Sequence, residues 1–126
     1  MKRLTHESIK TIGPYSPAAW AGNMLYLSGQ IGVDPKTGVF AGATTVEQAR
    51  QTMTNIGQIL QIAGLSYSNI VKTTIFLTDM ADFAAVNDVY ASFFPPGDYP
   101  ARETVAVVAL PRGAKIEISV VAYKPD

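Results

Sequence analysis

The sequence predicts an α+β fold in which one sheet carries two helices on a single face. Segments rich in β-branched residues are interspersed with two segments whose apolar residues recur every three or four positions. The strands come in groups, in the order strand, strand, helix, strand, helix, strand, strand. A length of 126 residues with 48% hydrophobic content suits one core, so residues 1–126 are expected to form a single domain.

The first expected strand covers residues 24–33, which combine apolar and aromatic side chains. Gly29 and Gly32 interrupt this segment, so a bulge or bend is expected within it. Residues 34–38 (Asp-Pro-Lys-Thr-Gly) have the composition of a turn. The chain is therefore expected to reverse there.

A long amphipathic helix is expected from Thr45 to Ala63, where apolar residues form one stripe at alternating spacings of three and four. Thr45 and Gln48 match a capping box at its start. Gly64 stands where a residue in the left-handed conformation commonly ends a helix.

Residues 70–77 are β-branched and almost continuously apolar, which is typical of a strand buried on both faces. A second helix is expected to be capped by Thr78 or Asp79 and to continue through Phe94. Its apolar stripe is Phe83, Val86, Tyr90 and Phe93. The run 95–97 (Pro-Pro-Gly) ends it.

Two final strands are expected at about 101–110 and 115–123, joined as a hairpin through residues 110–114. In the last strand, alternation separates the side chains into two sets. One set is Ile116, Ile118, Val120 and Ala122, and the other is Lys115, Glu117, Ser119 and Val121.

Two helices can cover only one face of this sheet, and strand 101–110 is largely apolar on both faces. An uncovered apolar face of this size indicates contact with another subunit, so an obligate homo-oligomer is expected. The alternative is that residues 1–20 fold across the second face.

Composition excludes several classes of function. Ten basic and ten acidic residues cancel, so no overall field steers the chain toward nucleic acid or an anionic membrane. The absence of cysteine excludes disulfides and thiolate sites, and His6 alone does not indicate a metal site. No secretory signal, membrane span, nucleotide-binding loop or serine-hydrolase motif is found. A cytoplasmic protein without metal or cofactor is expected.

Arg102 is the main candidate for binding an anion, because it follows the rigid turn 99–101 (Tyr-Pro-Ala) at the start of a strand. An arginine so placed can bind a carboxylate through two parallel hydrogen bonds. The alternative is a structural ion pair with a neighbouring acid. Glu103 is poorly suited to that pair, because adjacent strand residues point to opposite faces.

Glu117 and Tyr15 are further candidates. Alternation places Glu117 on the expected interface face, where a carboxylate is either paired or chemically active. With a close hairpin register, Arg102 and Glu117 would share one cleft. Tyr15 lies in a loop stiffened by two prolines and a glycine, and either covers a pocket or simply packs. The segment 28–30 offers backbone amides to a ligand or forms a bulge.

The chain resembles the RidA (YjgF) family over essentially its whole length. The resemblance rests on six short blocks in the family's order. They are Gly13-Pro14-Tyr15, Ser28-Gly29-Gln30-Ile31, residues 71–77 (Val-Lys-Thr-Thr-Ile-Phe-Leu), Val86-Asn87-Asp88-Val89-Tyr90, Pro100-Ala101-Arg102 and Lys115-Ile116-Glu117-Ile118.

The resemblance implies a chorismate-mutase-like sandwich assembled as a homotrimer, with sites between subunits. It also implies hydrolysis of reactive 2-imino and 2-enamino acids, such as 2-iminobutanoate and 2-iminopropanoate, to 2-oxo acids and ammonia. Arg102 would bind the substrate carboxylate, Glu117 would orient or deprotonate water, and Tyr15 would help close the cleft. The cleft would be lined by Gly29, Asn87 and the backbone of Thr104.

One position departs from the family pattern. Many relatives carry Ser-Cys after the arginine, whereas this chain has Glu103-Thr104. Glu103 would add a carboxylate that repels an anionic substrate. Two other functions remain open: a non-catalytic sensor of small carboxylic acids, and a ribonuclease or translation inhibitor. The zero net charge and single histidine argue against the second.

Overall fold

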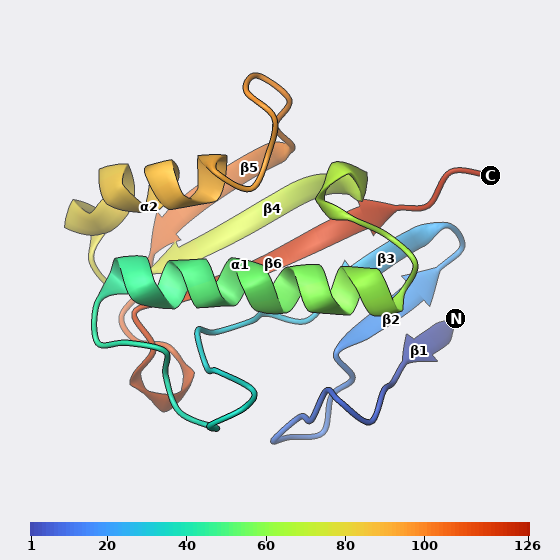
Figure 1. Ribbon diagram of the computed structural model, residues 1–126, viewed down its shortest axis with the longest axis horizontal. Coiled ribbons are helices and arrows are strands. Elements are labelled where there is room, and N and C mark those ends of the chain that lie inside the picture. The colour runs from blue at the N-terminus through green and yellow to red at the C-terminus, as the bar shows by residue number, and fades with distance from the viewer.

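The computed structural model describes residues 1–126 and contains one mixed sheet with two helices on the same face (Figure 1). The helices are α1 (Thr45–Ile62) and α2 (Phe83–Ala91). The strands are β1 (Lys2–Leu4), β2 (Ala18–Ala21), β3 (Met24–Leu27), β4 (Ile70–Leu77), β5 (Ala101–Ala106) and β6 (Ile116–Tyr123). Three short 3-10 turns are η1 (Tyr67–Asn69), η2 (Met80–Asp82) and η3 (Pro111–Gly113). The predicted α+β class is confirmed.

The strand order is β1-β2-β3-β6-β4-β5, and only β4 and β5 run parallel. The predicted hairpin between the last two strands is wrong, because β4 lies between β5 and β6 and pairs with both. Helix α2 carries the chain from β4 to the outer edge of the sheet, where β5 begins. The connection 107–115 is longer than the two to five residues of a typical hairpin loop, and it returns the chain to the other side of β4.

Three strands, rather than two, precede α1. The predicted strand 24–33 ends at Leu27, and the chain then forms a loop held by isolated bridges. Strands β1 and β2 extend the sheet edge beside β3, so residues 1–20 do not cover the second sheet face. Tyr26 and Val105, on that face, are 50% and 42% exposed.

The N-cap of helix α1 lies one residue earlier than predicted. Thr44, not Thr45, is the N-cap and forms a capping box with Glu47. Thr45 instead donates a hydrogen bond to Asp82 at 2.6 Å, which ties α1 to the start of α2. Gln48 is buried; its side chain donates to Gly42 O and accepts from Lys115 N. The helix end agrees with the prediction, since Gly64 has a φ of 79°.

Helix α2 is shorter at both ends than the predicted segment. Asp79 caps η2 by accepting a hydrogen bond from Ala81 N, and α2 begins only at Phe83. At the other end, the amides of Phe93 and Phe94 bond three residues back, so the last turn tightens before Pro95.

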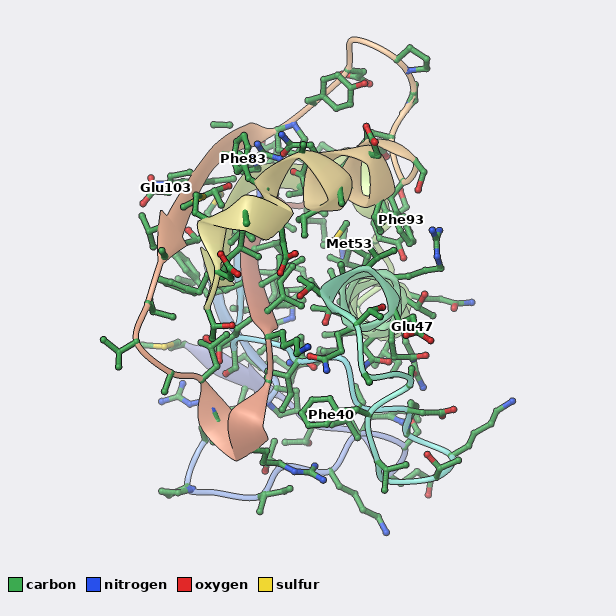
Figure 2. All side chains as sticks on the ribbon, turned by 90° about the vertical axis from the view of Figure 1, so that its left-hand side faces the viewer. Phe40, Glu47, Met53, Phe83, Phe93 and Glu103 are labelled. Carbon is green, nitrogen blue, oxygen red and sulfur yellow. The ribbon has the colours of Figure 1, made fainter.

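The core lies between the sheet and the two helices. Ile116, Ile118, Val120 and Ala122 are at most 2% exposed, as their alternation predicts. They belong to one core cluster with residues of α1 and α2, and Figure 2 shows Met53 of this cluster between the two helices. The opposite side, here called the free sheet face, is covered by no helix. It carries Tyr26, Lys72, Thr74, Phe76, Glu103, Val105, Glu117, Ser119 and Val121.

Candidate functional site

Arg102 lies on the helix side of the edge strand β5. The parallel register sets it beside Thr73, whose buried hydroxyl accepts a hydrogen bond from Tyr90 of α2 at 2.9 Å. The guanidinium carbon of Arg102 is 5.1 Å from the ring centroid of Tyr90 and 5.7 Å from that of Phe83. Two aromatic rings therefore hold this cation against α2.

The guanidinium of Arg102 has no acidic partner and no protein hydrogen bond. Glu103 instead pairs with Lys72 at 2.9 Å on the free sheet face, which is the only salt bridge in the chain. Figure 2 shows Glu103 and Phe83 on opposite sides of β5. The alternative of a structural ion pair at Arg102 is therefore wrong. The Glu103 carboxylate points away from Arg102 and is paired with Lys72, so the structure gives no reason to expect that it repels a substrate bound at Arg102.

Thr104 and Asn87 belong to the same neighbourhood. Thr104 is two residues beyond Arg102 on the same face of β5, and its buried hydroxyl has no hydrogen-bond partner. Asn87 is half-buried on α2, one turn after Phe83 and three residues before Tyr90, on the helix face that reaches Arg102. We call Arg102, Thr104, Phe83, Asn87 and Tyr90 the arginine cluster.

Glu117 lies on the free sheet face, opposite Phe76 of β4. Gly29 is packed against it so closely that an added Cβ would stand 2.5 Å from Glu117 Oε2. Two backbone hydrogen bonds between Gln30 and Ile118, of 2.8 and 3.0 Å, hold this loop on β6. Partial burial without a charged partner raises the pKa of Glu117.

The two residues that follow Tyr15, Ser16 and Pro17, are bonded to the same loop. Ser28, next to Gly29, donates its hydroxyl to Ser16 O at 2.6 Å and its amide to Pro17 O at 2.9 Å. The Tyr15 side chain remains 52% exposed. We call Glu117, Gly29 and Tyr15 the glutamate cluster. The structure thus brings together two groups of predicted site residues.

The two clusters lie on opposite faces of the sheet within one chain. Arg102 is aligned through Thr73 with Val120, which points to the helices. Glu117 is three positions before Val120 and therefore points the other way. The prediction that Arg102 and Glu117 share a cleft through a hairpin register is wrong for a single chain, because β4 separates their strands.

Sequence reasoning missed the part that Phe83 and Tyr90 play at the arginine cluster. Both belong to the apolar stripe that predicts the second helix, and Tyr90 is buried in the core. The stripe does not reveal that an arginine from a distant strand ends beside them. The signal that could have found them is two aromatic residues at a seven-residue spacing, a geometry suited to stacking a cation.

Other features give no competing site. A surface hollow of about 630 Å³ lies between the N-terminal strands and the end of α1, and one of about 60 Å³ lies beside η1. Neither contains a residue of the two clusters. No three His, Asp or Glu side chains are grouped so that they could bind a metal ion, and the ring of His6 bonds only to nearby Ser8. Neither helix combines the length and apolarity needed to span a membrane.

Comparison with known proteins gives consistent matches along the chain. A family model described as Endoribonuclease L-PSP matches residues 5–124. The mouse protein named 2-iminobutanoate/2-iminopropanoate deaminase is 44% identical, over 95% of this chain and 88% of its own length.

Solved structures share the fold over the full chain. The YjgF gene product of E. coli superposes with a TM-score of 0.91 at 43% identity, covering 99% of this chain and 100% of that one. E. coli TdcF with bound serine superposes with a TM-score of 0.90 at 39% identity, covering 99% of each chain. These matches include every residue range that contributes to the two clusters.

Proposed function

Because the chain belongs to the YjgF/RidA family, we propose that it is a hydrolytic deaminase that converts 2-imino and 2-enamino acids to 2-oxo acids and ammonia. The observation that carries this proposal is the unpaired guanidinium of Arg102, half-buried and stacked on two rings. The deaminase name of the mouse relative and the serine bound by TdcF support it, because an imino acid and an amino acid share an α-carboxylate.

The arginine cluster would bind the substrate. The guanidinium of Arg102 makes no hydrogen bond within the chain, so its N–H groups are available for two parallel bonds to a carboxylate. Such a charge-assisted interaction contributes about 1.5–3 kcal/mol. Asn87 and the backbone of Thr104 would line the same space.

The glutamate cluster would supply the chemistry. Water attacks the carbon of the protonated imine while Glu117 takes one of the water protons, which forms a neutral tetrahedral carbinolamine. Glu117 then gives this proton to the nitrogen. As the C–N bond breaks, Glu117 takes the hydroxyl proton, so that ammonia leaves and the 2-oxo acid forms; transfer of this last proton to ammonia restores the carboxylate as ammonium departs. Because burial raises its pKa, Glu117 is a stronger base than an exposed glutamate, and positioning provides the rest, so no cofactor is required.

A complete site needs two copies of the chain, since the clusters occupy opposite faces. We propose a homotrimer in which the β5 edge of one subunit, carrying Arg102, meets the free sheet face of the next, carrying Glu117 and Gly29. Tyr26 and Val105 supply exposed apolar surface for this contact. A head-to-tail contact repeated by a three-fold rotation closes into a ring.

The direct test is the release of 2-oxobutanoate and ammonia in a coupled threonine dehydratase reaction. Wild-type protein should accelerate the release, and Arg102→Ala should lose most of this acceleration. The proposal fails if wild type has no effect or if Arg102→Ala retains full activity.

Mixing inactive subunits tests the shared site. Arg102→Ala and Glu117→Gln chains, each inactive alone, should regain activity after unfolding and refolding together, because about a quarter of the interfaces would pair two intact residues in a randomly mixed ring. No recovery would contradict a site built from two subunits.

Two other functions would be revealed by separate measurements. Calorimetric binding of 2-oxobutanoate without any turnover of imines would favour a carboxylic-acid sensor that uses the same Arg102. The ribonuclease named in the family description would require RNA cleavage, with binding that weakens steeply as salt rises. The cytoplasm, where amino acid metabolism generates imines, is the expected location.

A further inference from the structure

We propose that Phe83 selects the side chain of the substrate, favouring small apolar groups over groups that carry a second carboxylate. This inference rests on the proposed function, because it takes the substrate carboxylate as anchored on Arg102. It follows from the unequal exposure of the two rings that hold this guanidinium.

The two rings have different surroundings. Tyr90 is only 4% exposed, and its hydroxyl is fixed by the hydrogen bond to Thr73. The Tyr90 ring therefore orients Arg102 from the core side and presents little surface to a ligand. Phe83, the first residue of α2, is 38% exposed, so part of its ring remains accessible beside the guanidinium.

The position of the substrate follows from the anchor. A carboxylate bound in the plane of the Arg102 guanidinium places its α-carbon just beyond the N–H groups. The centroid of Phe83 is 5.7 Å from the guanidinium carbon, so a substituent on the next carbon can reach the exposed ring. A methyl or ethyl group gains apolar contact there.

The charges around the cluster oppose a second carboxylate. Arg102 is the only cation of the arginine cluster and is already used by the first carboxylate. Lys72 of the neighbouring strand β4 points to the free sheet face and is paired with Glu103. A second negative charge would be desolvated against Phe83 without a partner, which is unfavourable.

The test compares three substrates with the full-length protein. An L-amino acid oxidase generates 2-iminopropanoate, 2-iminobutanoate and 2-iminosuccinate, and kcat/KM is measured for each. For wild type, kcat/KM should be highest for 2-iminobutanoate, lower for 2-iminopropanoate and lowest for 2-iminosuccinate. Phe83→Ala should lower kcat/KM for 2-iminobutanoate about tenfold relative to 2-iminosuccinate, since one or two methylenes discriminate on this scale. Phe83→Leu, which keeps apolar surface, should retain most of the preference.

Phe40 supplies a matched control. Its ring lies 5.8 Å from the guanidinium carbon of Arg112, a similar pair remote from Phe83 (Figure 2). Phe40→Leu should leave the ranking of substrates unchanged. If Phe83→Ala reduces kcat/KM for all three substrates by the same factor, the ring only orients Arg102 and the inference is overturned.

Failure of the proposed function is distinguishable from failure of this inference. If wild type turns over none of the imines, the deaminase proposal fails. Calorimetry of the wild-type and Phe83→Ala proteins with 2-oxobutanoate and oxaloacetate then tests Phe83 by itself. A preference for 2-oxobutanoate that is lost in the variant supports the selection by Phe83, and equal preferences refute it.

Discussion

Replacing Gly29 with alanine should disable Glu117 without unfolding the protein. The added Cβ would lie 2.5 Å from Oε2, 2.7 Å from Cδ and 3.0 Å from Cγ of Glu117. Since ordinary non-bonded separations are about 3.5 Å, the carboxylate must retreat by about 1 Å. A displacement of about 1 Å at a reacting group can reduce the rate about 100-fold. We therefore expect kcat to fall by about two orders of magnitude.

The fold should tolerate this substitution. The atoms that the new methyl group meets belong to the flexible end of a partly exposed side chain, which can rotate away. Gly29 is not among the glycines with positive φ, so alanine introduces no backbone strain there. The melting temperature of Gly29→Ala should stay close to that of wild type.

A second glycine provides the control for this experiment. A Cβ at Gly42 would also meet a carboxylate, that of Glu47, which caps α1 rather than lining the site. Gly42→Ala should lower the melting temperature and leave kcat/KM in the coupled threonine dehydratase assay nearly unchanged. Full activity of a folded Gly29→Ala protein would refute the role of Glu117 in activating water.

The remaining predictions concern charge, pH and assembly. Arg102→Lys keeps the charge but loses the two parallel hydrogen bonds to the carboxylate. KM should therefore rise and kcat/KM should fall at least tenfold, which corresponds to a loss of about 1.4 kcal/mol. Kinetics equal to those of wild type would contradict bidentate binding. Burial raises the pKa of Glu117 above its ordinary value of 4.5, so the protein is more stable when this side chain is protonated. This contribution to the free energy of unfolding is complete below pH 4.5 and is lost as the pH rises through the pKa of the folded state. Glu117→Gln should therefore melt higher than wild type at neutral pH, with the difference shrinking in acid; thermal melts across this range check the sign. Val105→Glu places a charge on the free sheet face and should give monomers by light scattering together with loss of activity, whereas an active variant of unchanged mass would contradict the proposed contact.

Local patterns in the sequence predict the elements themselves. The alternation from Ile116 to Ala122 identifies the buried face of β6, and the stripe that begins at Val46 identifies α1 to within one residue. The N-cap differs by one position because Thr44 and Thr45 are both capping residues, each followed three positions later by Glu or Gln. The hydrogen bond from Thr45 to Asp82, distant in sequence, distinguishes them in the structure.

Strand pairing depends on contacts that no local pattern contains. Nothing around Arg102 or in the connection 107–115 indicates that β4 lies between the last two strands. The pairing decides the site, because it separates Arg102 from Glu117 and places Arg102 beside Phe83. The sequence therefore predicts the candidate site residues but not their division between two faces.

Placing the two clusters on opposite faces has a consequence for the rate law. An enzyme whose site lies within one chain has a specific activity independent of its own concentration. Here the number of complete sites would follow the population of assembled rings, so specific activity should fall with dilution below the dissociation constant of the ring. Newly synthesised chains would then remain inactive until they meet others, and the onset of activity would show a lag that shortens as protein accumulates.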